Sequence, residues 1–315
     1  MKKAALPKPL SGIVVPMVTP LLDPNRLDSA ALERITEFLV VSGVHGLFVL
    51  GSTGEGPSLS PEIRRAVIQQ VCDQVAGRRP VLVGISDTCL AESLRWAEIS
   101  AEAGASAVVL APPYYLSASQ LELRHHVERL ADHLPLPLFL YNAPSFTRHS
   151  FAPETVRALA DLPIVAGLKD SSGDRIYFHQ VRYLLGERAE FSMLVGPEEL
   201  LADLLLWGGH GGVSGGAHLW PQLYTGLCEA AADRDLERVQ RLHELIMFVN
   251  VRIYGVSKVP SSVFKAIKCC LSLRGICKDV MAPPLEPLGP EERSALATLL
   301  KEMDQLLDRE VVLAR

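Results

Sequence analysis

The sequence predicts an α/β fold, a closed (β/α)8 (TIM) barrel followed by a C-terminal helical extension. Short β-rich runs alternate with amphipathic stretches of helical length along most of the 315 residues, a pattern typical of parallel βαβ units. There are eight strand-like runs, in units of about 25 to 35 residues, which favours a closed barrel over an open, doubly wound sheet. After the eighth unit the pattern becomes helical only.

The eight predicted strands are apolar runs bounded by turn-forming residues. In chain order they are Gly12–Val18, Gly46–Leu50, Pro80–Ile85, Ala107–Ala111, Leu138–Tyr141, Ile164–Leu168, Phe191–Val195 and His210–Ser214. Hydrophobic residues make up 48% of the chain and charged residues 21%, so a large buried core is feasible.

The predicted helices of the barrel carry apolar residues at spacings of three and four. They include Ser29–Val41, Pro61–Val75, Ala91–Ala103, Ser119–Leu130, Pro153–Leu159 and Leu200–Leu206. Several begin with a capping residue or a proline, as Ser60 and Pro61 do, and both residue types favour a helix N-terminus.

Three further helices are predicted beyond the eighth unit: Leu236–Val249, Ser261–Leu273 and Pro290–Leu307. We therefore expect a catalytic barrel over residues 1–232 and a helical extension, packed on the barrel, over residues 233–315.

Charge and cysteine usage argue for a small-molecule partner. The net charge of −5 and the pI near 6.0, without a Lys/Arg-rich run, provide no surface for nucleic acid. No apolar stretch has the length of a signal peptide or a membrane span, so we expect a cytoplasmic protein that binds no membrane. The six cysteines are scattered without the paired spacing of metal ligands, and we expect no metal.

Active sites of (β/α)8 barrels lie at the carboxyl ends of the strands. The second predicted strand ends in a Gly-rich loop, residues 51–56, which contains Ser52 and Thr53. Its amide and hydroxyl donors could converge on a carboxylate or a phosphate. The alternative is a tight turn whose hydroxyls cap the next helix.

The fifth and sixth predicted strands end in Tyr141 and Lys169. A lysine at the barrel mouth, with limited solvent around it, could act as an amine nucleophile, and Tyr141 could exchange a proton beside it. Taken singly, Lys169 could instead pair with Asp170, and Tyr141 could be structural. Because strands two, five and six all end at one face, these residues together predict a single pocket.

Five short motifs can be compared with those of known families: Gly51-Ser52-Thr53-Gly54-Glu55, Pro113-Tyr114-Tyr115, Tyr141-Asn142-Ala143-Pro144, Gly167-Leu168-Lys169-Asp170 and Gly208-Gly209-His210-Gly211. Through these motifs the sequence resembles the dihydrodipicolinate synthase and N-acetylneuraminate lyase family of class I aldolases, from Gly12 to about Leu288.

The resemblance implies that Lys169 forms a Schiff base with a 2-oxo acid such as pyruvate and that Tyr141 is the acid/base residue. It implies that Ser52 and Thr53 hold the carboxylate of the 2-oxo acid and that Val213 contributes a backbone contact. It also implies a homotetramer, a dimer of dimers, in which Tyr115 reaches into a neighbouring subunit's site to complete a hydroxyl relay through Ser52.

The implied chemistry is consistent with these side chains. An iminium on Lys169 is an electron sink, so the C3–C4 bond of a 4-hydroxy-2-oxo acid can break while Tyr141 takes the hydroxyl proton. The reverse reaction joins pyruvate to an aldehyde. No metal or organic cofactor is required.

One departure from the family pattern and one similarity to it concern the second substrate. Where the synthases of the family place an arginine that clamps a carboxylate, this chain has Phe146, which cannot form that ion pair; Arg148 is the possible substitute. Gly196, Glu198 and Glu199 follow the seventh strand where the sialic acid lyases bind substrate hydroxyls. The alternative role for the two glutamates is to complement a helix dipole.

Three functions follow from these patterns. The favoured one is a lyase for a 2-keto-3-deoxy sugar acid or another 4-hydroxy-2-oxo acid. The first alternative is a 4-hydroxy-tetrahydrodipicolinate synthase, which condenses pyruvate with aspartate semialdehyde. The second is a non-catalytic 2-oxo acid sensor, which would not need a nucleophilic amine.

Overall fold

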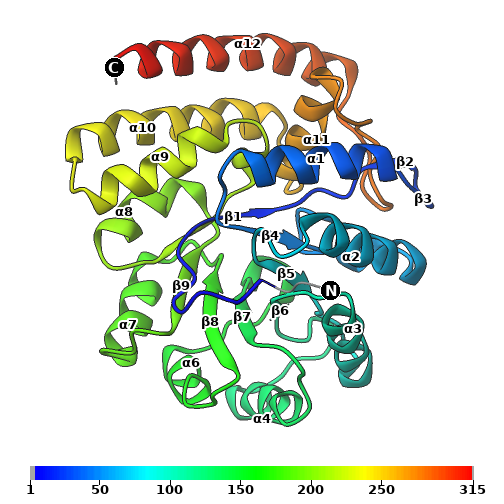
Figure 1. The fold of residues 1–315 in the computed structure, drawn as a ribbon, viewed down its shortest axis with the longest axis vertical. Coiled ribbons are helices and arrows are strands. Elements are labelled where there is room, and N and C mark those ends of the chain that lie inside the picture. The colour runs from blue at the N-terminus through cyan, green and yellow to red at the C-terminus, as the bar shows by residue number, and fades with distance from the viewer. Residues whose placement is uncertain (1–3, 314–315) are drawn as a thin grey trace.

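Eight parallel strands close into a barrel in the order β1-β10-β9-β8-β7-β6-β5-β4, which confirms the predicted (β/α)8 fold (Figure 1). The computed structural model describes residues 4–313. The first three residues of the predicted barrel segment, 1–3, and the last two of the predicted extension, 314–315, lie outside the described residues. The barrel strands are β1 Gly12–Pro16, β4 Gly46–Val49, β5 Val81–Gly84, β6 Ala107–Leu110, β7 Leu138–Asn142, β8 Val165–Asp170, β9 Ser192–Val195 and β10 Gly211–Val213.

A small antiparallel ribbon, which the sequence analysis did not predict, follows β1. It consists of β2, Leu21–Asp23, and β3, Arg26–Leu27, and it precedes the first barrel helix. Because β2 and β3 pair only with each other, the ribbon leaves the eight-stranded barrel intact.

Helices connect the barrel strands. They are α1 Ser29–Val41, α2 Pro61–Val75, α3 Leu90–Glu102, α4 Gln120–Ala131, α5 Pro144–Thr147, α6 Pro153–Leu159, α7 Arg175–Leu185, α8 Leu201–Leu206 and α9 Pro221–Ala232, with short 3₁₀ turns η1 Gly56–Ser58, η2 Glu198–Leu200 and η3 Gly215–His218. The predicted bounds of α1, α2 and α6 are confirmed, whereas α7 and α9 were not among the helices named from the sequence. Ser60 caps α2 by accepting a hydrogen bond from the amide of Ile63, at 3.4 Å.

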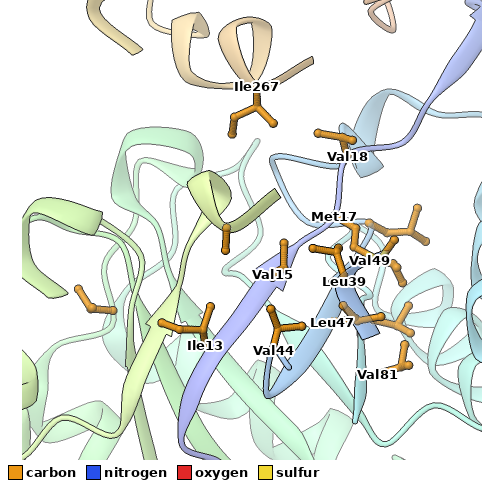
Figure 2. Close-up of a cluster of buried hydrophobic side chains, with 14 of the residues drawn as sticks. Ile13, Val15, Met17, Val18, Leu39, Val44, Leu47, Val49, Val81 and Ile267 are labelled. Carbon is orange, nitrogen blue, oxygen red and sulfur yellow. The ribbon is translucent and has the colours of Figure 1, made fainter. Parts of the chain in front are cut away.

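The barrel is held by two apolar layers, because successive side chains of a strand point to opposite faces. Inside the barrel, Phe48, Phe139, Tyr141 and Val213 belong to one buried cluster. The larger cluster fills the space between strands and helices. Figure 2 shows part of it, residues of β1 and β4 with Ile267 of a C-terminal helix directed toward them.

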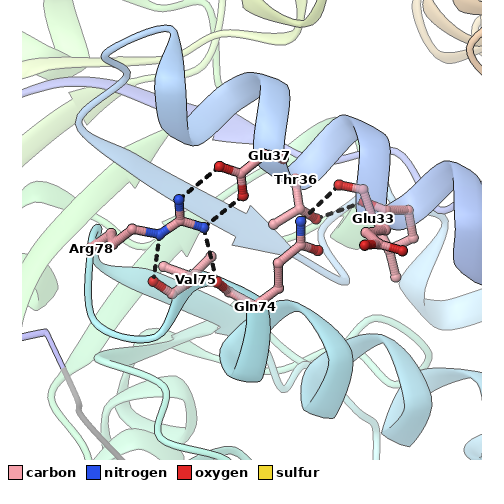
Figure 3. Close-up of polar contacts among 7 residues, drawn as sticks. Glu33, Thr36, Glu37, Gln74, Val75 and Arg78 are labelled. Carbon is pink, nitrogen blue, oxygen red and sulfur yellow. Dashed lines mark hydrogen bonds and ion pairs between the residues drawn. The ribbon is translucent and has the colours of Figure 1, made fainter.

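The packing of α1 on α2 is supplemented by polar contacts at its solvent edge (Figure 3). Arg78, just after α2, donates to both carboxylate oxygens of Glu37 on α1, at 2.8 and 2.7 Å. Gln74 donates to the backbone carbonyl of Glu33, at 2.8 Å. Because Arg78 and Glu37 are both close to half exposed, we assign the contact to orientation of the two helices rather than to stability.

The chain after α9 is helical, as predicted. It contains α10 Leu236–Phe248, a π-helical segment η4 Val249–Ile253, a 3₁₀ turn η5 Tyr254–Val256, α11 Ser262–Leu273 and α12 Pro290–Leu313. In Figure 1 α12 lies alongside α10 at the top of the view, and the two helices contact each other. Within the described residues, no helix combines the length and the apolar character that crossing a membrane demands.

Candidate active site

The centre of the site is a pair of side chains on neighbouring strands. Tyr141 of β7 and Lys169 of β8 are directly opposite each other in the parallel register, so both point into the barrel at its carboxyl end. The Nζ atom of Lys169 lies 4.0 Å from the centre of the Tyr141 ring and 5.0 Å from that of Phe48. Both side chains are largely buried, with Lys169 7% and Tyr141 6% exposed. The amine therefore lies between two aromatic rings at the floor of the mouth.

The hydroxyl of Tyr141 is placed for proton transfer. It lies 3.3 Å from the hydroxyl oxygen of Ser52, within hydrogen-bonding distance. Burial raises the pKa of Tyr141, but the positive charge of Lys169 and hydrogen bonds with Ser52, Ser171 and Lys169 outweigh it, so the pKa falls below its ordinary value of 10. The phenol therefore loses its proton more readily than a free tyrosine does.

The loop that carries Ser52 and Thr53 requires a specific backbone path. Leu50, at the end of β4, has a positive φ of 59°, which is uncommon for a residue with a side chain. Its carbonyl oxygen lies so close to Gly56 and Gly84 that a Cβ atom on either glycine would overlap it. Glycine at these two positions is what lets the loop fold back over the barrel mouth.

A buried hydrogen-bond network supports the Tyr141–Lys169 pair from the neighbouring positions. The side-chain amide of Asn142 donates to the carboxylate of Asp170, at 2.9 Å, and its Oδ1 atom accepts from the backbone amide of Phe151. Asp170 also accepts from the amide and the hydroxyl of Ser172. Asp170 is thus paired within this network, which leaves Lys169 free of the Lys169–Asp170 contact considered from the sequence.

A cleft of about 850 Å³ opens above Lys169. The predicted residues Ser52, Thr53, Tyr141, Phe146, Lys169, Gly196, Glu198, Glu199 and Val213 all line it. The structure therefore brings together the residues predicted from five strand ends, with Tyr115 as the exception.

The opposite wall of the cleft comes from the C-terminal helices, and sequence reasoning missed it. Asn250 of η4, Tyr254 of η5 and Phe264 of α11 line the cleft. The amide nitrogen of Asn250 donates to the carbonyl of Ile246, at 2.9 Å, so its amide oxygen is left as an acceptor. A π-helical turn often marks a functional position, but the local sequence gave no sign of it.

The two predicted glutamates have different environments. Glu198 is buried, and its carboxylate accepts from the amide of Gly216 and from the hydroxyls of Tyr224 and Tyr254. Burial raises the pKa of Glu198, although these hydrogen bonds oppose the rise. Glu199 is exposed. Because the carboxylate of Glu198 is hydrogen-bonded within the protein, Glu199 is the glutamate whose oxygens are open to a substrate.

Phe146 lines the cleft and also a second cavity of about 680 Å³ on the other side of Ser52 and Tyr141. Arg148 is exposed and lines neither. The second cavity contains Arg64, whose guanidinium lies 4.5 Å from the ring centre of Trp96. Arg64 was not singled out from the sequence, because it lies within an ordinary amphipathic helix.

Tyr115 lies apart from the cleft in the single chain. It follows β6 and is 85% exposed, beside the exposed Leu116. An aromatic side chain in this position has no internal packing partner of its own, which is compatible with the predicted contact to a second subunit.

The described residues contain no group of three or more His, Cys, Asp or Glu side chains arranged to hold a metal ion. The groups that line the cleft include an amine, a phenol and hydroxyl donors, from Lys169, Tyr141, Ser52 and Thr53.

Comparisons with known proteins identify the family of the chain. Residues 9–303 match the dihydrodipicolinate synthetase family. A 4-hydroxy-tetrahydrodipicolinate synthase of Thermomicrobium roseum is 34% identical over 92% of this chain and 94% of its own. A putative 2-dehydro-3-deoxy-D-gluconate aldolase of Escherichia coli, YagE, is 31% identical over 93% of this chain and 97% of its own.

Solved structures give the same result. A dihydrodipicolinate synthase of Bacteroides thetaiotaomicron superposes with a TM-score of 0.90, at 49% identity, and covers 93% of this chain and 99% of its own. The structure of YagE in complex with pyruvate has a TM-score of 0.86, at 30% identity, and covers 93% of this chain and 98% of its own.

Proposed function

The chain belongs to the dihydrodipicolinate synthetase family and is a carbon–carbon lyase, and we propose that it holds a pyruvate-like 2-oxo acid as a Schiff base on Lys169. The observation that carries the proposal is the placement of the Lys169 amine 4.0 Å from the ring centre of Tyr141 at the floor of the cleft. A buried amine beside an acid/base group is the arrangement that imine chemistry uses.

The proposed reaction begins with attack of the Lys169 amine on the C2 carbonyl of a 4-hydroxy-2-oxo acid. Loss of water gives the iminium. Tyr141, as the phenolate, takes the proton of the C4 hydroxyl, the C3–C4 bond breaks, and its electrons pass into the iminium to form an enamine. Release of the aldehyde, protonation of C3 and hydrolysis return pyruvate and the free amine. In the direction of synthesis the same steps run backwards.

The carboxylate of the 2-oxo acid is assigned to the loop after β4. Ser52 and Thr53 line the cleft together with Lys169, and their hydroxyls and amides are donors suited to an anion. Val213, at the end of β10, also lines the cleft and is assigned a backbone contact to the same substrate.

The substrate that fits best has a hydroxylated tail, as in a 2-keto-3-deoxy sugar acid. Among the described residues that line the cleft, Lys169 is the only cation, and it is the proposed nucleophile. The wall facing the tail offers acceptors: the amide oxygen of Asn250, the hydroxyl oxygen of Tyr254 and the carboxylate of Glu199. Acceptors bind hydroxyl groups, whereas a second carboxylate would need donors or a cation.

The synthase remains the second candidate, and one observation favours it. Arg64 lines the cavity that adjoins Ser52, Tyr141 and Phe146, so the carboxylate of aspartate semialdehyde could find a cation there. The sensor alternative gains nothing from the structure, because binding alone does not need an amine and a phenol in this arrangement.

We also propose that the enzyme is a cytoplasmic homotetramer in which Tyr115 enters a neighbouring site. Two exposed apolar regions support an assembly: Tyr115 with Leu116, and Ile176, Tyr183 and Trp207 on and beside α7 and α8. Exposed apolar groups of this size favour protein contacts.

Borohydride trapping tests the mechanism. Wild type incubated with pyruvate and borohydride should gain one reduced pyruvate adduct, which peptide mass spectrometry should map to Lys169. Lys169→Ala should give none, and Lys265→Ala, which removes a lysine from α11, should be trapped like wild type. An adduct that persists in Lys169→Ala would refute the assignment. Initial rates with a 2-keto-3-deoxy sugar acid and with pyruvate plus aspartate semialdehyde then separate the lyase from the synthase.

A further inference from the structure

An ion pair between two fully buried side chains connects the loop after β4 with the C-terminal helices. The carboxylate of Glu55 lies 2.5 Å from the Nζ atom of Lys268 on α11, and both side chains are 1% exposed. The other carboxylate oxygen of Glu55 accepts from the backbone amide of Ala282, at 2.7 Å. Lys268 also donates to the carbonyl of Val280, at 2.8 Å.

Burying such an ion pair has a large desolvation penalty. Each charge loses its water, and removing either partner leaves the other uncompensated, so a buried pair is weak evidence for stability on its own. Burial lowers the pKa of Lys268, and the carboxylate of Glu55 opposes that shift. The hydrogen bond of Glu55 with Ala282 joins residues that lie 227 positions apart in the chain, so the contacts of Glu55 connect two distant segments.

A continuous set of contacts leads from this pair to the reacting groups. The amide of Glu55 donates to the carbonyl of Ser52, at 3.0 Å, and the amide of Gly56 donates to that of Gly51, at 3.2 Å. These hydrogen bonds close the loop into a tight turn. The hydroxyl of Ser52, in the same turn, lies 3.3 Å from that of Tyr141.

The backbone at Glu55 makes the turn dependent on this anchor. Its φ is +56°, a left-handed conformation that a residue with a side chain adopts only when its surroundings hold it there. Besides the contacts of Glu55 and the contact between Ser52 and Tyr141, the turn accepts a hydrogen bond from outside, from the hydroxyl of Thr19 to the carbonyl of Gly54, at 2.7 Å. Glu55 is thus the residue of the turn whose side chain reaches the C-terminal helices.

We propose that the Glu55–Lys268 pair is a positioning device that holds the loop after β4 so that Ser52 meets both Tyr141 and the carboxylate of the 2-oxo acid. The C-terminal helices then contribute to the site twice, once by lining the cleft and once through this anchor. The proposal rests on the proposed function, because Ser52 is assigned to the carboxylate there.

The test is the double variant Glu55→Met/Lys268→Met, which removes both charges while nearly conserving side-chain volume. Replacing a buried pair with apolar residues usually preserves folding, so a melting curve near that of wild type is expected. The pyruvate concentration that half-saturates borohydride trapping on Lys169 should rise about tenfold, because small displacements of a positioning group have large effects. The amount of adduct at saturation should be unchanged.

Two further variants distinguish a positioning role from a general loss of rigidity in the protein. In a Ser52→Ala background the double substitution should raise the half-saturating concentration by less than about twofold, because effects on one contact chain are not additive. The control is Arg241→Met, which breaks the ion pair between α10 and Glu310 of α12 without touching the loop, and it should leave the half-saturating pyruvate concentration unchanged.

The outcomes are distinct. A folded double variant that is trapped at the wild-type pyruvate concentration overturns the positioning role, and so does a full additional loss in the Ser52→Ala background. Absence of any adduct on Lys169 in wild type overturns the proposed function itself. If the double variant does not fold, Lys268→Arg, which keeps the charge but changes its reach, is measured in its place, with the same expected rise and the same refutation.

Discussion

Substitution of Tyr141 by phenylalanine isolates the phenol from the rest of the site. The ring is 6% exposed in the barrel interior, and phenylalanine keeps that packing and the aromatic contact with the Lys169 amine, at 4.0 Å from the ring centre. The atom lost is the hydroxyl oxygen, 3.3 Å from Ser52. Loss of one such hydrogen bond should lower the unfolding free energy by only about 1 kcal/mol.

The effect on turnover should be much larger. General acid/base catalysis by one group contributes about 10²- to 10⁴-fold to the rate, which corresponds to about 3 to 5 kcal/mol of the barrier. We therefore expect kcat for cleavage of a 4-hydroxy-2-oxo acid to fall by that factor, measured by coupling pyruvate release to lactate dehydrogenase.

Trapping of the imine provides the internal control for this prediction. Tyr141→Phe should still form the borohydride adduct on Lys169 at saturating pyruvate, because the amine remains in place. If kcat falls by less than about fivefold in a variant of unchanged melting temperature, the assignment of Tyr141 as the acid/base residue is wrong.

Two other predictions concern stability and specificity. His218 accepts a hydrogen bond from the amide of Val18 and donates one to the carbonyl of Gly215, and burial lowers its pKa from 6.5 to about 4. Between these two pH values the unfolded chain binds a proton at His218 that the folded chain does not bind. The unfolding free energy should therefore fall by about 3 kcal/mol as the pH drops from about 6.5 to 4. Urea titrations across that range check this, and a profile in His218→Gln that is as steep as that of wild type would contradict it. Phe146→Arg should place a guanidinium in the cleft, lower kcat/KM for 2-dehydro-3-deoxy-gluconate by about tenfold and raise condensation of pyruvate with aspartate semialdehyde. Unchanged rates with both substrates would show that position 146 does not select the substrate.

Most of the fold could be predicted from the sequence, because hydrophobic periodicity is a local property. Eight apolar runs and the helices between them identified the barrel, and the predicted bounds of α1, α2 and α6 are those of the structure. The ribbon of β2 and β3 was missed because its strands, Leu21–Asp23 and Arg26–Leu27, are too short to show an alternating pattern.

The floor of the candidate site could likewise be predicted from the sequence. A (β/α)8 barrel places the ends of all its strands at one face, so residues at strand ends, such as Tyr141 and Lys169, could be assigned to one pocket from their order along the chain. The register that sets them opposite each other follows from the same topology.

The remaining parts of the site depend on contacts that no local pattern encodes. From its place after a strand, Glu198 was predicted to bind substrate hydroxyls. In the fold its carboxylate accepts hydrogen bonds from Gly216 and from two tyrosines of later segments. Asn250 belongs to a π-helical turn within an ordinary amphipathic stretch, and Glu55 finds its counter-charge on Lys268, in the last third of the chain. Local patterns in the sequence therefore specify which strands form and which reactive groups lie at their ends. Which of these groups remain open to a substrate depends on the three-dimensional fold, because burial and pairing involve segments that are distant in the chain and meet only once the barrel has closed.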